Sequence, residues 1–122
     1  MILGTGIDIV EIERIKLTIT KWGSRFLNKV FTDNEIAYCN SKADPAQHFA
    51  VRFAAKEAFY KALPQNREYT FSWKDIEVIS EKSGNPLLKT SGISGRLGDI
   101  SVHLSLSHSK ESAVAVVIIE NI

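Results

Sequence analysis

The stretch Arg52-Phe53-Ala54-Ala55-Lys56-Glu57-Ala58-Phe59-Tyr60-Lys61 places charged residues on what should be the packing face of a helix. Side chains four positions apart lie on one face of an α-helix, so Phe53, Glu57 and Lys61 form a row. Phe49 extends this row by one more turn. A carboxylate among such apolar groups loses hydration, so it needs a cation or a metal ion beside it.

The same charges also have an ordinary interpretation. Glu57 and Lys61 are four positions apart, and most such pairs are solvated surface ion pairs that contribute about 0.3–0.5 kcal/mol. The helix alone favours this interpretation, and the choice depends on the rest of the chain.

Composition limits the class of protein. The chain has 122 residues, enough for one domain with its own core, and its 44% hydrophobic and 24% charged residues are typical of a globular protein. A net charge of +1 gives no argument for binding nucleic acid or a membrane. The longest apolar run, residues 113–119, is too short to span a bilayer, and no export signal is expected. The single cysteine, Cys39, fits a reducing cytoplasm and is interpreted as a plain thiol.

The pattern of apolar residues predicts an α+β fold, in which an antiparallel sheet packs against a long central helix and shorter helices. Strands are expected over residues 2–10, 76–79, 86–89, 102–107 and 113–119, and helices over residues 11–19, 24–30, 32–40 and 44–63. Residues 91–97 are ambiguous. The last strand is so apolar that both of its faces should be covered.

Two of the predicted helices begin with clear capping signals. Thr32-Asp33-Asn34-Glu35 is a capping box. In Asp44-Pro45-Ala46-Gln47 the aspartate is the expected N-cap, proline occupies the first helical position, and Gln47 should reach back to the cap. Pro64 should end this long helix.

The first predicted strand contains two glycines and a carboxylate. Gly4 and Gly6 are unfavourable inside a strand, and they indicate a bulge or a close approach of backbone or ligand. Asp8 follows within an apolar run, where a lone carboxylate is poorly placed unless it binds something.

Three segments therefore supply candidate groups for chemistry: Asp8 from the first strand, Glu57 and Lys61 from the long helix, and His108 from the end of a core strand. Two carboxylates without a histidine or cysteine cluster suit a hard cation such as Mg²⁺, which leaves positions for water and substrate phosphates. A lysine one turn away can reach the same phosphates, as phosphoryl-type transfer requires. Taken singly, Asp8 is more often bonded to backbone amides and His108 is more often an ordinary turn residue.

Three blocks stand in order along essentially the whole chain. They are Gly6-Ile7-Asp8 with Arg14 after it, residues 52–63, and Ser105-Leu106-Ser107-His108-Ser109-Lys110-Glu111. Together they resemble the signature motifs of the 4′-phosphopantetheinyl transferases, and more closely the short bacterial form of that family. The resemblance implies one transferase domain over residues 1–122 with the family's fold.

The resemblance also implies a reaction. Coenzyme A, bound as its Mg²⁺ complex with Mn²⁺ as a possible substitute, donates 4′-phosphopantetheine to a serine of apo acyl carrier protein. The products are holo acyl carrier protein and adenosine 3′,5′-bisphosphate, and the pathway is fatty-acid biosynthesis. The short form of the family further implies a homotrimer with active sites between subunits.

Roles for individual residues follow from the same resemblance. It assigns Asp8 and Glu57 to Mg²⁺, and Lys61 to the departing phosphate, which it would neutralise or protonate. Arg52 and His108 would contact phosphates of coenzyme A, including the 3′-phosphate. The general base is left open between Glu57 acting through a water and an unassisted serine hydroxyl near the metal.

Two turns bear on the adenosine end of coenzyme A. Gly84 and Pro86, in Gly84-Asn85-Pro86, fit a family motif that lies near adenosine. Pro64 departs from the glycine-containing loop that is usual after the long helix, and it supplies no backbone N–H for a phosphate. Lys56 points away from the Glu57 row, and a structural role and a substrate contact are equally open for it.

A basic segment without acidic residues covers residues 14–31. Solvated helix faces often have this composition. An acidic carrier protein, however, needs a complementary positive surface. Given the resemblance, we favour docking of the carrier protein, with Phe26 as an apolar anchor among Arg14, Lys21, Arg25 and Lys29.

Two other functions are compatible with these residues. A metal-dependent diphosphate hydrolase could use the same carboxylates and would cleave coenzyme A without an acceptor protein. A non-catalytic module that binds a carrier protein or a nucleotide would bind its partner without metal.

Overall fold

The computed structural model describes residues 1–64, 72–80, 84–90, 93 and 98–122. Their elements follow the chain in the order β1 (Ile2–Glu11), α1 (Ile12–Trp22), α2 (Ser24–Val30), α3 (Asp33–Asn40), α4 (Pro45–Ala62), the 3₁₀ turn η1 (Trp73–Asp75), β2 (Glu77–Ser80), β3 (Pro86–Lys89), β4 (Ile100–His108) and β5 (Ser112–Asn121). The ambiguous residues 91–97 lie outside the described residues except for Ile93, which is buried.

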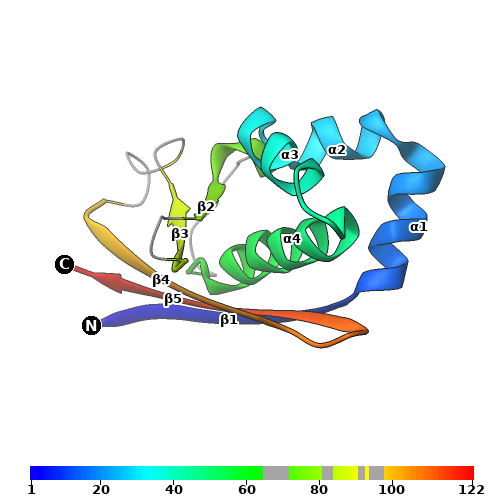
Figure 1. Cartoon of the computed structure of the whole chain (residues 1–122). Helices are drawn as coiled ribbons and strands as arrows, with labels where there is room; N and C mark the ends of the chain where they lie inside the picture. Colours follow the sequence, from blue (N-terminus) through cyan, green and yellow to red (C-terminus); the bar gives the residue numbers. More distant parts are fainter. Residues whose placement is uncertain (65–71, 81–83, 91–92, 94–97) are drawn as a thin grey trace.

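The chain forms two layers (Figure 1). One layer is an antiparallel sheet in the order β1-β5-β4, and α4 lies along one of its faces while the shorter helices and the β2-β3 hairpin lie on the same side. The predicted α+β class with a long central helix is confirmed. The β2-β3 hairpin forms a separate sheet, which differs from the single sheet that we expected.

The two glycines of β1 allow α4 to lie unusually close to the sheet. A Cβ atom on Gly4 would lie 1.9 Å from the carbonyl oxygen of Ala62, and one on Gly6 would lie 1.9 Å from that of Ala58. Real side chains cannot occupy such positions, so the sequence prediction of a close backbone approach is confirmed. Asp8 lies on the same face of β1, opposite Ala115 of β5, so its side chain meets α4.

The ends of the helices agree with the capping signals, with one exception. The Thr32–Glu35 capping box makes both of its hydrogen bonds, and the Asp44 side chain accepts a hydrogen bond from the Gln47 backbone N–H. The Gln47 side chain does not reach back to the cap. It lies 2.7 Å from Nδ1 of His108 at the end of β4 instead.

Helix α1 is longer than predicted. It continues past residue 19 to Trp22, and Gly23, with φ of 53°, then separates it from α2. Among the described residues, no helix combines the length and the hydrophobicity needed to cross a membrane.

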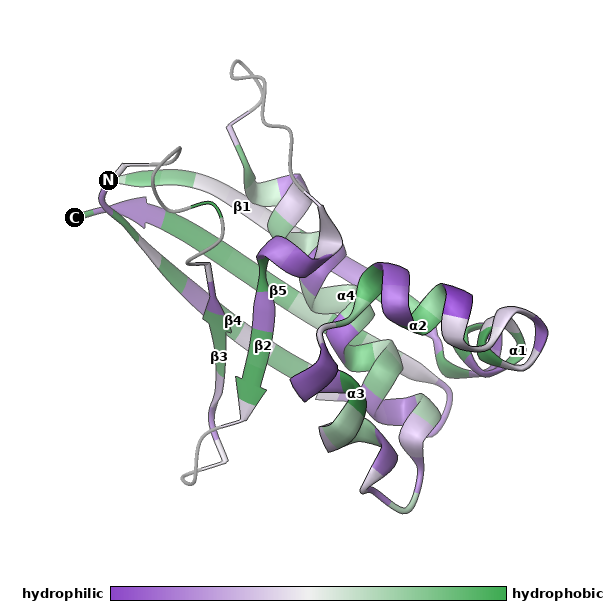
Figure 2. Cartoon of the chain, turned by 90° about the horizontal axis from the view of Figure 1, so that it is seen from above, coloured by the Kyte–Doolittle hydropathy of each residue, from purple (hydrophilic) through white to green (hydrophobic). Residues whose placement is uncertain are grey.

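Among the described residues, strand β5 is fully covered on one face only, which corrects the expectation for residues 113–119. Its alternate residues, such as Ala115 and Val117, are completely buried beneath α4. Figure 2 colours most of β5 as hydrophobic, yet its other face remains partly exposed. On the neighbouring strand β1, Ile7 and Ile9 of this outer face are 62% and 69% exposed.

Candidate functional site

The row of residues on α4 leads from the core to the surface. Phe49 is buried, Phe53 and Glu57 are partly buried, and Lys61 is exposed. Four residues advance an α-helix by about 400°, so each member of the row is rotated by about 40° from the one before. This drift brings the charged members to the rim of the core, where a cavity begins.

Lys61 uses its ammonium group on β1 rather than on Glu57. Its Nζ atom donates to Asp8 Oδ1 at 2.9 Å and to the carbonyl oxygen of Ile7 at 3.1 Å. The simple surface pair between Glu57 and Lys61 is therefore replaced by an ion pair between α4 and β1. The close approach at Gly6 makes this pairing possible.

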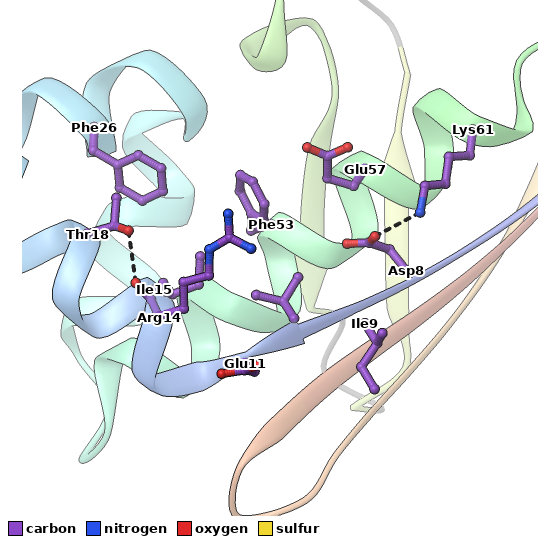
Figure 3. Close-up of a pocket in the computed structure, with 11 residues that line it drawn as sticks. Asp8, Ile9, Glu11, Arg14, Ile15, Thr18, Phe26, Phe53, Glu57 and Lys61 are labelled. Atoms are coloured by element: carbon purple, nitrogen blue, oxygen red, sulfur yellow. Dashed lines mark hydrogen bonds and ion pairs between the residues drawn. The ribbon is translucent and has the colours of Figure 1, made fainter.

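Glu57 lies beside this ion pair without a hydrogen-bond donor among the described residues. Burial raises the pKa of Glu57 above its ordinary value, the Asp8 carboxylate raises it further, and Lys61 opposes both effects. The two carboxylates thus repel each other across a partly desolvated space. Figure 3 shows Asp8 and Lys61 joined by their ion pair, with Glu57 next to them.

These three residues, the carboxylate–lysine cluster, line one side of a cavity of about 510 Å³. Arg14 from α1, Phe26 from α2 and Phe53 from α4 are among the residues that line the remainder, as Figure 3 shows. The cavity therefore has an acidic side next to β1 and a side with aromatic and basic groups next to α1 and α2. It is large enough to hold part of an extended phosphorylated ligand.

The cluster suits a hard divalent cation. Asp8 and Glu57 offer carboxylate oxygens, their mutual repulsion is relieved by a positive charge, and the Lys61 ammonium already occupies such a position beside Asp8. Among the described residues, no group of three or more histidine, cysteine, aspartate or glutamate side chains could hold a metal. Protein ligands would thus be few, and water and substrate oxygens would complete the coordination.

A second group, the basic cluster, comprises Lys42, His48, Arg52 and His108. Burial is the largest cause that lowers the pKa of His48, and the nearby Arg52, Lys42 and His108 side chains lower it further. None of the four lines the cavity of the carboxylate–lysine cluster. Within one chain, the structure therefore does not bring Arg52 and His108 together with Asp8 and Glu57.

Arg52 is only 4% exposed and is held by protein groups. Its guanidinium donates to Ser80 Oγ at 3.0 Å and to the carbonyl oxygen of His48 at 3.4 Å, and it lies 4.3 Å from the centre of the Tyr38 ring. Its buried Nε has no partner among the described residues. His108 is exposed at the end of β4 and is oriented by Gln47.

Comparison with known proteins identifies the family. A sequence profile of the 4′-phosphopantetheinyl transferase superfamily matches residues 4–117. The chain belongs to this superfamily. A holo-[acyl-carrier-protein] synthase of Koribacter versatilis (strain Ellin345) is 46% identical over 99% of this chain and 100% of that protein.

Solved structures of similar proteins agree with this assignment. A holo-(acyl-carrier-protein) synthase from Bacillus anthracis, in complex with CoA (3′,5′-ADP), has a TM-score of 0.84 and 40% identity, covering 100% of this chain and 99% of that chain. The synthase from Helicobacter pylori, in complex with coenzyme A, has a TM-score of 0.80 and 31% identity, covering 95% and 99% of the two chains. The resemblance found in the sequence is confirmed, and so is the predicted fold.

The remaining residues that the sequence of this superfamily member predicted for the site lie in different parts of the structure. Arg14 and Phe26 line the cavity, while Lys21, Arg25 and Lys29 are exposed on α1 and α2. Pro86 is the first residue of β3, and Gly84, with φ of 87°, lies two residues before it; neither lines the cavity. Pro64 directly precedes residues 65–71, which lie outside the described residues.

The sequence of this superfamily member did not predict that Glu35 is the partner of Lys56. Both side chains are completely buried, and Lys56 Nζ lies 2.7 Å from Glu35 Oε1. Of the two roles left open for Lys56, the structure supports the structural one. The usable signal was the position of Lys56 one residue from the Glu57 row, which directs it toward the other side of α4. The predicted plain thiol Cys39 is buried nearby, and burial raises its pKa to about 11.

Proposed function

We propose that this chain is a phosphopantetheinyl transferase that modifies acyl carrier protein. In the proposed reaction, a serine oxygen of the apo carrier protein forms a bond to the phosphorus that bears the pantetheine arm of coenzyme A. The bond from this phosphorus to the bridging diphosphate oxygen breaks, and adenosine 3′,5′-bisphosphate leaves. The observation that carries the proposal is the carboxylate–lysine cluster beside a cavity, in a chain that matches holo-[acyl-carrier-protein] synthases along its whole length.

Asp8 and Glu57 would hold Mg²⁺, with Mn²⁺ as a possible substitute. When bound, the ion would supply positive charge to the diphosphate oxygens. Lys61 would turn from Asp8 toward the leaving phosphate, since its side chain is 52% exposed and has room to move. Glu57 would accept the serine proton through a water, or the serine hydroxyl would react unassisted near the metal.

The outer face of the β1-β5-β4 sheet is the proposed interface of a homotrimer. Ile7 and Ile9 are among its exposed apolar residues, and no described element of the chain covers them. Exposed apolar patches on a sheet mark sites of association. A second copy is the expected occupant because β5 is apolar on both faces over residues 113–119, as a strand buried in an assembly would be.

The separation of the two clusters supports active sites between subunits. Arg52 and His108 are proposed to bind the phosphates of coenzyme A, yet they lie apart from Asp8 and Glu57 in one chain. A neighbouring copy could bring its basic cluster to the carboxylate–lysine cluster of the first. The turn at Gly84 and Pro86 would then contribute to the adenosine end of the same site.

Exposed charges on α1 and α2 form the proposed docking surface, which we define as Arg14, Lys21, Arg25, Phe26 and Lys29. An acidic carrier protein would be attracted to it electrostatically. Phe26 would provide an apolar contact because it is partly exposed at the edge of the cavity. The proposed setting is fatty-acid biosynthesis in the cytoplasm, where a free buried thiol such as Cys39 is common.

The reaction is tested with apo acyl carrier protein, coenzyme A and Mg²⁺, and intact-mass spectrometry follows the carrier protein. A mass gain of one phosphopantetheine is expected, and a carrier protein whose acceptor serine is replaced by alanine should show none. The Asp8→Ala and Glu57→Ala variants should each lose the transfer. No mass gain would refute the proposal, and hydrolysis of coenzyme A without any carrier protein would favour the diphosphate hydrolase.

The homotrimer is tested by light scattering on a sizing column. Ile9→Asp should reduce the mass from that of a trimer to that of a monomer, because a carboxylate in an apolar interface loses its hydration. Leu87→Asp is a matched control, since Leu87 is 44% exposed but lies on β3 outside this sheet. A wild-type protein that is monomeric would refute the assembly.

A further inference from the structure

The interior contains a lysine that the proposed chemistry does not use. Lys56 is completely buried, and its ammonium group donates to the carbonyl oxygen of Val30 at 2.8 Å, to Glu35 Oε1 at 2.7 Å and to the carbonyl oxygen of Trp73 at 3.0 Å. A lysine ammonium has three hydrogens to donate, so every one of them is used. The group is therefore fixed in place.

Glu35 extends this set of bonds to two more segments. Its Oε1 also accepts from the Thr32 backbone N–H at 2.9 Å, and its Oε2 accepts from the Val78 backbone N–H at 2.8 Å. The pair thus ties the end of α2, the start of α3, the turn η1 and the strand β2 to α4. We call these five hydrogen bonds the Lys56–Glu35 clamp.

The clamp lies next to both proposed functional surfaces. Lys56 precedes Glu57 on α4, and Val30 is the last residue of α2, which carries Arg25, Phe26 and Lys29. The clamp therefore fixes the end of α2, which we call the docking helix, to α4, which carries Glu57 and Lys61 of the carboxylate–lysine cluster.

An aromatic row runs beside the clamp and reaches the cavity. The ring of Trp73, whose carbonyl oxygen the clamp holds, stacks on Phe53 with centroids 5.5 Å apart and an interplanar angle of 21°. Phe53 lies 6.1 Å from Phe26, and both rings line the cavity. Movement of Trp73 would thus change the wall between Glu57 and the docking helix.

Stability alone does not explain a buried ion pair of this kind. Apolar residues of similar volume usually stabilise a core as well as a buried pair does, because both charges must lose their hydration. What a fully bonded pair adds is a fixed geometry among segments that are distant in the sequence.

We propose that Lys56 and Glu35 are positioning residues that hold the docking helix α2 in a fixed relation to Glu57, so that a bound carrier protein presents its serine to the transfer site. The inference rests on the proposed function and adds two residues that touch neither coenzyme A nor the carrier protein. Loss of the clamp should impair use of the carrier protein much more than use of coenzyme A.

The main variant removes both charges, in the form Lys56→Met/Glu35→Gln, so that no unpaired charge remains buried. We expect the KM for apo acyl carrier protein to rise about tenfold, because a displaced α2 would weaken the contacts of Arg25, Phe26 and Lys29 with the carrier protein. The KM for coenzyme A should stay within about twofold of the wild-type value, since none of the five clamp bonds involves a member of the basic cluster. Hydrogen exchange of the α2 backbone should become faster.

Two further proteins keep the test decisive. Ile119→Ala, a buried change in β5 outside the clamp, serves as a control for general destabilisation and should leave the carrier-protein KM unchanged at a similar loss of Tm. Glu35→Asp keeps the opposite charge beside Lys56 but shortens the side chain by one methylene, so it should fold if the double variant does not, with a rise in the carrier-protein KM of about threefold.

The outcomes separate the two proposals. A wild-type chain that transfers nothing refutes the proposed function, and the exchange rates of α2 then still report on the clamp. Wild-type transfer combined with an unchanged carrier-protein KM in the folded variants would overturn the positioning role. So would an equal rise of both KM values, or the same KM rise in Ile119→Ala.

Discussion

Replacing Lys61 by methionine should tighten the binding of a divalent cation while it slows transfer. Lys61 Nζ lies 2.9 Å from Asp8 Oδ1, where a bound cation would place its own charge. A metal ion must therefore displace the ammonium group before Asp8 can coordinate it. Methionine keeps most of the length of the lysine side chain and removes this competition.

The size of the effect follows from exposure. The side chains of Lys61 and Asp8 are 52% and 15% exposed, so water screens their pair, which should contribute about 0.2–1 kcal/mol. After displacement, the ammonium can move away into solvent, which limits its remaining repulsion of the cation to a similar amount. Together these terms predict about 1 kcal/mol, or cation binding about fivefold tighter.

Electron paramagnetic resonance of free Mn²⁺, in a titration at low ionic strength without coenzyme A, measures this affinity. Lys89→Met, an exposed lysine on β3, controls for the change in net charge, and Asp8→Asn should weaken binding. The transfer rate of Lys61→Met should fall about 100-fold because the leaving phosphate loses its cation. Cation binding that is unchanged or weaker in Lys61→Met would refute the reasoning.

Three other variants test separate parts of the structure. Burial raises the pKa of Glu57, so the stability that its protonated form contributes is present below the ordinary carboxyl pKa and is lost as pH rises through the raised value. Glu57→Gln should therefore increase the Tm of the metal-free protein at pH 7.5 but not at pH 4. An unchanged Tm at both pH values would contradict this. Gly6→Ala should cost about 1–3 kcal/mol in denaturant unfolding, because its Cβ would meet the Ala58 carbonyl oxygen, and a wild-type midpoint would contradict the close approach. Arg25→Glu should raise the KM for carrier protein and weaken its salt dependence, whereas Lys89→Glu should not, and equal effects of both would argue against docking on α2.

Local signals in the sequence predicted most of the elements correctly. The Thr32–Glu35 capping box forms as expected because its hydrogen bonds join residues three apart. The glycines of β1 indicated a close approach, and the structure shows that α4 is the element that approaches. In both cases the physical cause lies within a few residues of the signal.

Contacts between distant segments were not predictable in this way. Gln47 could reach either its own cap or another element, and its choice of His108 depends on where β4 ends. Similarly, the i, i+4 spacing favoured a pair between Glu57 and Lys61, but Lys61 pairs with Asp8 because β1 lies so close to α4. The apolar character of β5 indicated that both faces are covered, but it did not show that the described residues leave one face partly exposed.

The two lysines near Glu57 on α4 differ in burial, and this difference suits them to different roles. Lys56 is 0% exposed and uses all its hydrogens on fixed oxygen atoms, so any movement would leave a buried charge unpaired. Lys61 is 52% exposed, and water can replace each bond that it breaks. A cation that must move between a carboxylate and a phosphate during a reaction can do so only in the second environment. For this reason the drift of the α4 row toward the surface matters as much to the proposed chemistry as the identity of the charged residues.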